Sequence, residues 1–310
     1  MAEISAKMVN DLRAKTGAGL MDCKRALTGT NGDFDEAIKV LREKGLAVAA
    51  KKADRIAAEG VVDILYCEEY KTAAMIEVNS ESDFVAKNAD FLAFVRGCLD
   101  VIMDKRPADV AALLALPFGE SGMTVDAMLK EKILTIGENL NIRRFVLAEG
   151  PMSTYIHGKG AIGVVVKFNA DAACEGNPGF AEVAKNVALQ IAAMSPAYLD
   201  RAAVPKSVVD NEMEILAAQI KNDPSNASKP ANIIEKMTVG RINKFYEGNC
   251  LLDQVYVKDD SLTVGKYVAA KAGEFGGAMS VDSFYRFEKG EGIERREDNF
   301  AEEIAKLAGQ

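Results

Sequence analysis

The sequence predicts an α+β fold built from several modules, and three observations lead to this prediction. Two stretches, 61–103 and 144–194, each place apolar strand-like runs before an amphipathic helix. Such strand–strand–helix units bury one face of an antiparallel sheet under helices. The length of 310 residues favours more than one domain. Apolar residues make up 49% of the chain, enough to fill more than one core.

Residues 1–45 predict three short helices, with a glycine-rich break between the first two. Asp33 followed by Glu36 resembles a capping box at the start of the third helix. We expect that helix to end at Lys44-Gly45 and a helical linker to follow it. The N-terminal three-helix module with its linker is therefore assigned to 1–56.

Two units with antiparallel sheets are predicted to form the core. The first is assigned to 57–142, and the second to 143–199 together with 249–290. Strands are expected at Val61–Cys67, Thr72–Val78, Arg144–Ala148, Thr154–Ile156, Ala161–Phe168, Gln254–Val257 and Ser283–Phe287. Helices are expected at 88–103, 125–136, 178–194 and 264–270, the second of them ended by Gly137.

Residues 200–248 predict a protruding antiparallel helical hairpin inserted into the second unit. Its apolar positions are spaced as in a narrow coiled-coil seam. Two helices leave apolar area uncovered, so we expect the hairpin to dock on another surface, such as a second copy in a homodimer. The residues assigned to this dimerisation surface are Val209, Met213, Leu216, Ile220, Ile234 and Met237. Residues 291–310 are expected to form a C-terminal helical module, with a helix at 298–308.

Charge and composition exclude several function classes. A net charge of −8 and a pI near 5.0 do not fit a generic nucleic-acid binder. We see no apolar signal-peptide region at the N-terminus and no apolar run of about 18 residues, so we expect a cytoplasmic protein without a membrane partner. The five cysteines lie far apart and form no C-x-x-C pair, which argues against disulfides and zinc.

The sequence offers no constellation for catalysis. It contains no P-loop, no complete dinucleotide-binding fingerprint and no nucleophile elbow. The only histidine, His157, lies in a His-Gly-Lys-Gly turn and is equally well an ordinary turn residue. We therefore expect no enzyme, no metal and no cofactor.

Residues 79–94 are the most informative stretch, because Asp83 and Phe84 lie where a predicted strand gives way to a helix. Side chains at such a junction can project from a rigid scaffold toward a partner protein. Two simpler interpretations remain open at this point. Asp83 would cap the following helix, and Phe84 would be a core residue of it.

Several motifs, in order and at matching spacing, resemble the bacterial elongation factor Ts family. The resemblance covers essentially the whole chain. The motifs are Thr16-Gly-Ala-Gly-Leu-Met-Asp-Cys-Lys-Arg-Ala-Leu27, Asp83-Phe-Val-Ala-Lys87, Ile136-Gly-Glu-Asn-Leu-Asn-Ile-Arg-Arg144, Tyr155-Ile-His-Gly158 with Ile162-Gly-Val-Val-Val166, and Gly290-Glu-Gly-Ile293.

The resemblance implies a ubiquitin-associated-like module at the N-terminus and a nucleotide-exchange activity toward elongation factor Tu. The factor would promote GDP release by perturbing the magnesium and phosphate site of that GTPase. In the family, a pair matching Asp83 and Phe84 enters the GTPase near this site. The other positions that match partner contacts are Arg13, Leu20, Met21, Lys24, Ile136, Gly137, His157 and Val257. Read from the residues alone, the four N-terminal positions would equally be core or solvated surface.

Three positions depart from the family pattern. Ser82 stands where threonine is common before the Asp-Phe pair, and it keeps the hydroxyl group. Ala161 stands where arginine is frequent, and Lys258 replaces an apolar residue beside Val257.

Two other function classes are left as alternatives. An enzyme would turn over a small substrate without any GTPase, and a bare ubiquitin-associated-like adaptor would retain partner binding in residues 1–45 alone.

Overall fold

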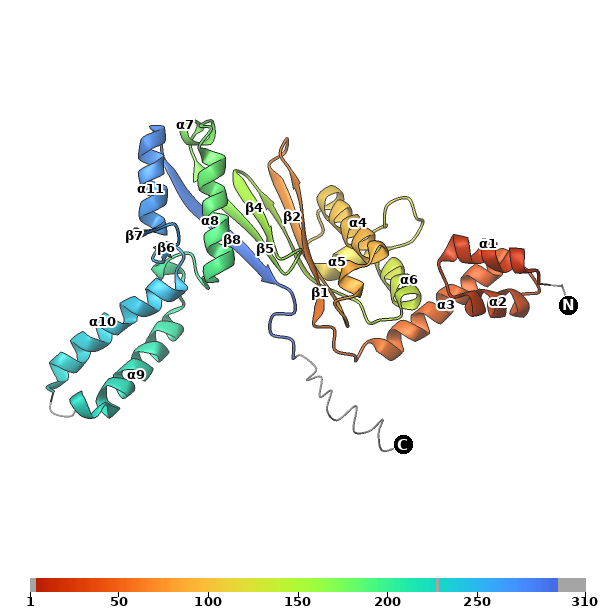
Figure 1. Ribbon diagram of the computed structural model, residues 1–310, viewed down its shortest axis with the longest axis horizontal. Coiled ribbons are helices and arrows are strands. Elements are labelled where there is room, and N and C mark those ends of the chain that lie inside the picture. Colours follow the sequence, from red (N-terminus) through yellow and green to blue (C-terminus); the bar gives the residue numbers. More distant parts are fainter. Residues whose placement is uncertain (1–3, 227–228, 295–310) are drawn as a thin grey trace.

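Three helices open the chain, followed by two antiparallel sheets with helices on their outer faces (Figure 1). The computed structural model describes residues 4–226 and 229–294. It confirms the α+β prediction with its N-terminal helices and antiparallel sheets. In these described segments, no helix is long and apolar enough to cross a membrane.

Three helices form the N-terminal part, and the first and third begin at polar caps. They are α1 (Ala6–Thr16), α2 (Leu20–Gly29) and α3 (Phe34–Lys52). The Asp33 side chain accepts a hydrogen bond from the Glu36 amide and caps α3. Leu12, Cys23 and Leu27 are fully buried in the small core between the three helices.

The prediction that the third helix ends at Gly45 is wrong. Helix α3 continues to Lys52 and includes most of the predicted linker. Gly45 is buried because α3 approaches α6 (Val125–Ile136) at this position. A Cβ atom on Gly45 would lie 3.6 Å from Leu134 Cδ2. The glycine is therefore explained by a helix–helix contact rather than by a helix end.

The first sheet has the strand order β1-β2-β3, and all its neighbours are antiparallel. Its strands are β1 (Glu59–Cys67), β2 (Thr72–Ser80) and β3 (Asn141–Glu149). The sequence grouped the third of these with the second unit, but β3 pairs with β2. The chain returns to this sheet after α4 (Ala89–Lys105), α5 (Val110–Ala115) and α6, which cover its outer face.

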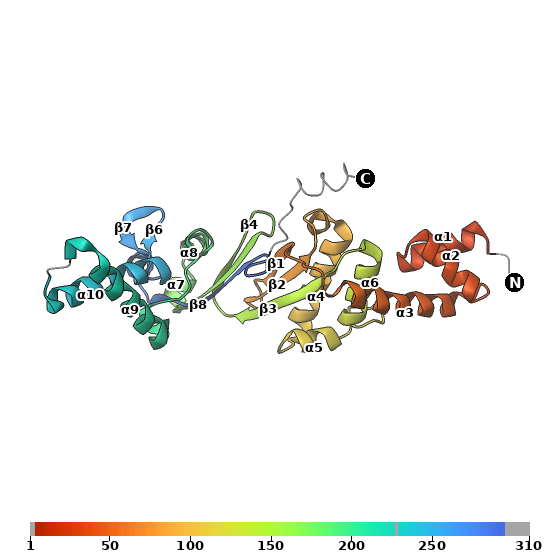
Figure 2. The ribbon, with the colours of Figure 1, turned by 90° about the horizontal axis from the view of Figure 1, so that it is seen from below.

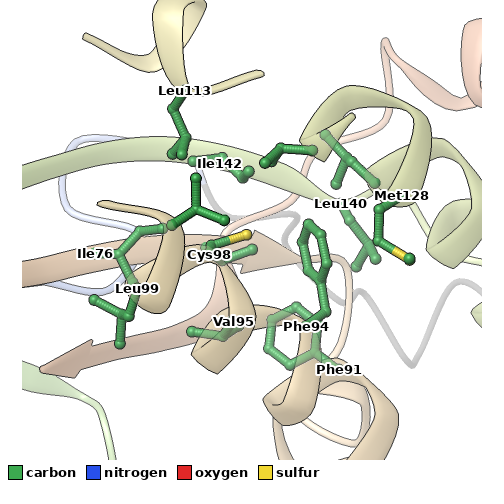
Figure 3. Packing of buried hydrophobic residues seen from close by; sticks show 14 of the residues in the cluster. Ile76, Phe91, Phe94, Val95, Cys98, Leu99, Leu113, Met128, Leu140 and Ile142 are labelled. Atoms are coloured by element: carbon green, nitrogen blue, oxygen red, sulfur yellow. The ribbon is translucent and has the colours of Figure 1, made fainter. Parts of the chain in front are cut away.

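Figure 3 shows the core between these helices and the first sheet. Phe91, Phe94 and Val95 of α4 belong to the same buried cluster as Ile76 of β2 and Ile142 of β3 (Figure 3). The amphipathic helix predicted at 88–103 is confirmed. The Phe94 ring stacks on Phe118, with 5.6 Å between the ring centroids.

The second sheet has the order β4-β5-β8 and is also antiparallel. Its strands are β4 (Met152–His157), β5 (Ile162–Ala170) and β8 (Met279–Glu288), and its outer helices are α7 (Ala172–Glu175), α8 (Phe180–Met194) and α11 (Val264–Phe275). A separate two-stranded ribbon consists of β6 (Val255–Tyr256) and β7 (Asp259–Thr263), of which the sequence predicted only the first strand.

The inner faces of the two sheets pack against each other. Val62 and Met75 of the first sheet share a buried cluster with Val165 and Phe287 of the second. A Cβ atom on Gly163 would lie 2.5 Å from Val62 Cγ1, so only glycine permits this close approach. Every residue of β2 is buried, because helices cover one of its faces and the second sheet covers the other.

The predicted helical hairpin is present and extends away from the sheets (Figures 1 and 2). It consists of α9 (Lys206–Asn222) and α10 (Ala231–Asn249), which pack on each other, with single 3-10 turns η2 (Arg201–Ala203) and η3 (Pro224–Asn226) at the ends of α9. Ile220 and Ile234 are buried within the protomer. Val209, Met213, Leu216 and Met237 are half-buried. The helix predicted at 298–308 lies outside the described residues.

Candidate functional site

Phe84 is the most exposed large apolar side chain among the described residues, with 81% of its surface accessible. It follows β2 and directly precedes a 3-10 turn, η1 (Val85–Lys87). Helix α4 starts only at Ala89 and is capped by the Asn88 side chain. Both simpler interpretations are therefore wrong: Asp83 does not cap α4, and Phe84 is not a core residue.

Asp83 is held by a neighbour on the same turn. Its carboxylate accepts a hydrogen bond of 2.6 Å from Lys87 Nζ. This hydrogen bond lowers the pKa of the exposed Asp83 carboxyl, which stays ionised at neutral pH. The same Lys87 ammonium lies 6.0 Å from the centroid of the Phe84 ring. The loop thus presents a negative charge, a positive charge and an apolar ring to solvent.

The structure brings three of the candidate segments to one place. Phe84, Ile136 and Gly17 line a hollow of about 310 Å³. Ile136 is the last residue of α6, and Gly137 caps that helix in a left-handed conformation with φ of 89°. Gly17 precedes α2, which carries Leu20 and Met21. The N-terminal helices and the Asp83–Phe84 loop therefore border the same surface.

The four N-terminal candidates are all exposed. Leu20 has 45% and Met21 has 59% of its surface accessible, while Arg13 and Lys24 are exposed charged residues. A core role for Leu20 and Met21 is excluded by this exposure. Two exposed apolar side chains beside two cations form a surface suited to a protein partner.

His157 and Val257 lie on other parts of the molecule. His157 ends β4 at an exposed turn, and its Nδ1 atom is 3.0 Å from the Tyr155 hydroxyl. Val257 follows β6 and is 49% exposed. The β6–β7 ribbon and the N-terminal helices lie at opposite ends of the long axis (Figures 1 and 2). The candidate contacts are thus spread along the molecule and do not form one pocket.

A buried amide network supports the Val257 turn. The Gln190 side chain is fully buried, and its Oε1 atom accepts a hydrogen bond from the Val257 amide. Its Nε2 atom donates to Gln254 Oε1 and to the Val255 carbonyl. Lys258 donates to Asn186 Oδ1 at 2.7 Å, so its ammonium group is tied to α8 beside the exposed valines.

Val255 is an apolar surface residue that the sequence analysis missed. It is 49% exposed, as Val257 is, and precedes it by two residues. Because Val255 and Val257 are two residues apart, both lie on the same face of the predicted strand. The sequence did not indicate whether this face would be exposed to solvent. Glu138 belongs to a quoted motif, but the sequence did not indicate that its carboxylate accepts hydrogen bonds from the backbone amides of Glu81 and Ser82.

No chemical group at these sites indicates a reaction. In the part of the chain that the structure describes, no cluster of three or more His, Cys, Asp or Glu side chains could hold a metal ion. All five cysteines are free thiols. Burial raises the pKa of the Cys98 thiol far above its ordinary value, which makes it unreactive.

Comparisons with known proteins identify the family of the chain. A sequence model of the family described as "Elongation factor TS" matches residues 81–291. The chain is 46% identical to Elongation factor Ts of Clostridium perfringens (strain SM101 / Type A) over 311 residues, covering 99% of this chain and 100% of that protein. It is 45% identical to Elongation factor Ts of Syntrophotalea carbinolica over 308 residues, covering 98% and 99% of the two chains. The chain therefore belongs to the elongation factor Ts family.

Proposed function

We infer that the chain acts as the nucleotide-exchange factor of elongation factor Tu during translation elongation. This is the activity of the family to which the chain belongs, and it takes place in the cytoplasm. The factor is not an enzyme, because it changes the affinity of another protein for its nucleotide. An adaptor made of the N-terminal helices alone does not account for a family match that begins at residue 81.

Exchange of this kind requires negative coupling between two ligands of the GTPase. A G-domain holds nucleotide and magnesium through charge, with phosphates on backbone amides and a lysine. A factor that expels them must favour a conformation that binds them weakly. The coupling is reciprocal, so bound nucleotide weakens factor binding as much as the factor weakens nucleotide binding.

We propose that Phe84 provides part of this coupling by packing into the GTPase beneath its magnesium site. The observation that supports the proposal is the 81% exposure of an aromatic ring on a loop that is fixed at both ends. Burying such a ring stabilises a complex by roughly 1.5–3 kcal/mol. Each tenfold weakening of nucleotide binding requires about 1.4 kcal/mol, so Phe84 accounts for one to two factors of ten.

The remaining free energy must come from other contacts on the same partner. We propose that Arg13, Leu20, Met21 and Lys24 bind beside the loop, that Ile136 and Gly137 border it, and that His157 and Val257 bind farther along. All of these residues except the half-buried Ile136 are exposed, and Ile136 shares a hollow with Phe84; both observations support this assignment. Asp83 would disturb hydrogen bonds of the partner next to the magnesium ion.

The replacement Phe84→Ala tests the proposal. We expect factor-stimulated release of a fluorescent GDP analogue, followed by stopped flow, to slow by about tenfold or more. Thermal unfolding of the free variant should be unchanged, because the ring is exposed and packs on little. Tyr70→Ala is the matched control, since Tyr70 is 70% exposed in the β1–β2 turn, away from the candidate surface. An unaltered release rate in Phe84→Ala would refute the proposed role.

We also propose that the hairpin forms a homodimer. The observations in favour are the half-buried residues Val209, Met213, Leu216 and Met237, which retain exposed apolar area after α9 and α10 have packed together. Ile220 and Ile234, which are buried between α9 and α10, would hold the two helices together beneath that surface. The dimer is separate from exchange in this proposal.

A further inference from the structure

Glu138 connects two of the candidate contact segments. It directly follows Ile136 and Gly137, and its carboxylate reaches the residues that precede Asp83. Glu138 Oε2 accepts hydrogen bonds from the backbone amides of Glu81 and Ser82, each at 3.0 Å. Its Oε1 atom accepts a hydrogen bond of 2.6 Å from the Ser82 hydroxyl.

A second carboxylate makes the reverse connection. Glu81 Oε1 accepts a hydrogen bond of 2.6 Å from the Asn139 amide. The Asn139 side chain is buried and donates to the carbonyl of Arg55 at 2.8 Å and to that of Ala53 at 3.3 Å. Lys52 Nζ donates to the Gly137 carbonyl. The turn after α6, residues 137–139, therefore holds both the Asp83–Phe84 loop and the segment that leads from the N-terminal helices.

The hydrogen bonds to Glu138 lie just beyond the end of β2, where the sheet no longer fixes the backbone. The ladder between β2 and its neighbours ends at Ser80. Beyond it, the amides of residues 81 and 82 have no strand partner, and the Glu138 carboxylate satisfies both. Hydrogen bonds to an ionised acceptor are stronger than neutral ones. A loop fixed in its binding conformation avoids the entropic cost of ordering when it meets a partner.

We propose that Glu138 is a positioning residue for nucleotide exchange, which acts by holding the loop that carries Phe84. The proposal rests on the proposed function of Phe84 described above. Glu138 fixes the Asp83–Phe84 loop relative to Ile136, so that both enter the partner in one geometry. Glu138 works through Phe84 and contributes no separate contact to the coupling.

The test measures factor-stimulated GDP release from elongation factor Tu over a range of factor concentrations. We expect Glu138→Ala to lower the maximal release rate by about tenfold, with a smaller change in the half-saturating concentration, because the remote contacts remain. Glu138→Gln should recover most of the rate. Its amide oxygen accepts the two backbone bonds, and its amide nitrogen donates to the Ser82 hydroxyl. Glu120→Ala is the control, an exposed glutamate on another loop.

A double variant distinguishes positioning from general damage. Because Glu138 acts through Phe84, Glu138→Ala should slow release little further in a Phe84→Ala background. Amide hydrogen exchange of the isolated chain should become faster at residues 81 and 82 in Glu138→Ala and increase much less in Glu138→Gln, whose neutral oxygen still accepts both bonds but more weakly.

Three outcomes would overturn the inference: fully additive losses in the double variant, unchanged amide exchange in Glu138→Ala, or a Glu138→Gln rate as low as that of Glu138→Ala. A normal rate in Glu138→Ala beside a slow Phe84→Ala would refute the role of Glu138 alone. A normal rate in Phe84→Ala would instead refute the proposed function on which it rests.

Discussion

Phe84 and Phe91 are the same residue type seven positions apart, yet their surroundings are opposite. Phe91 is fully buried, whereas Phe84 is 81% exposed. The difference arises from the start of α4, which the Asn88 cap sets at Ala89. Phe91 then lies on the helix face toward the first sheet, and Phe84 precedes the helix. Helical spacing identified the buried ring, but no local pattern distinguished the exposed one.

Gly45 and Gly97 both lie inside helices, and their surroundings predict opposite effects of the same substitution. A Cβ atom on Gly45 would meet Leu134 Cδ2 at an ordinary 3.6 Å. Gly45→Ala should therefore stabilise the protein by about 0.5–1 kcal/mol, because alanine loses less backbone entropy in a helix.

The matched control is Gly97→Ala, whose Cβ would lie 2.3 Å from Phe118 Cζ. It should destabilise by about 1–3 kcal/mol, since the ring must leave its stack on Phe94. Urea unfolding of both variants measures these changes. A loss of stability in Gly45→Ala would show that α3 and α6 pack more tightly than the structure indicates.

At the level of elements, the α9–α10 hairpin carries two different apolar surfaces. The predicted seam lies partly between α9 and α10 of the same hairpin, where Ile220 and Ile234 are buried. Ile215 points elsewhere on α9 and is 42% exposed. Intramolecular packing thus uses part of the seam, and only its half-buried residues are left to bind a second copy.

Replacement of Val209, Met213 and Leu216 by polar residues tests the proposed dimer. We expect the dimer fraction in sedimentation velocity to fall. The variant replaces apolar area that the dimer would bury with polar groups, which favour contact with water. Stimulated GDP release at saturating factor should change little. Ile215→Gln is the control on the other face of α9 and should leave the dimer intact. An unchanged sedimentation profile in the triple variant would argue against this surface.

At the scale of the whole molecule, Glu77 joins the two halves. It is fully buried on β2, and its carboxylate accepts hydrogen bonds from Arg143 at 3.0 Å, Arg144 at 2.6 Å and the Gly290 amide at 2.8 Å. The Arg144 guanidinium also lies 4.2 Å from the Phe287 ring centroid. Glu77 thereby connects the first sheet to the chain that leaves β8.

The charge on Glu77 makes stability depend on pH. Burial alone would raise the pKa of this carboxyl, but the bonds from Gly290, Asn79 and the two arginines lower it below the ordinary value of 4.5. A lowered folded-state pKa stabilises the protein above the unfolded value, and this stabilisation is lost as pH falls through the folded value.

Glu77→Gln should cost about 3 kcal/mol near neutral pH, because the half-buried guanidinium groups of Arg143 and Arg144 lose the buried carboxylate that pairs with them. The difference from the unaltered chain should shrink as pH falls below the ordinary pKa of 4.5 and through the lowered folded-state pKa, because the unaltered chain then also loses the charge on Glu77. Urea unfolding between pH 7 and about 3 measures this, with Glu69→Gln as an exposed control. A difference that does not vary with pH would contradict a charged Glu77.

Local patterns predicted much of the fold, because they depend on neighbours in the chain. The cap at Asp33, the helix end at Gly137 and the amphipathic pattern of α4 depend on contacts within a few residues. The pairing of β3 with β2 was not predictable in this way. The strand is more than sixty residues from its partner, and its pattern fits either sheet equally well.

The sequence by itself determined the α+β class, most helices and strands, and through its ordered motifs the family and the segment that carries Phe84. Tertiary structure alone decided that Phe84 is exposed, that Gly45 marks a helix contact, and that Glu138 holds the loop from 57 residues away. The physical reason is that periodicity and capping arise from local backbone geometry. Exposure and hydrogen bonding between distant loops arise only when separate elements have packed together.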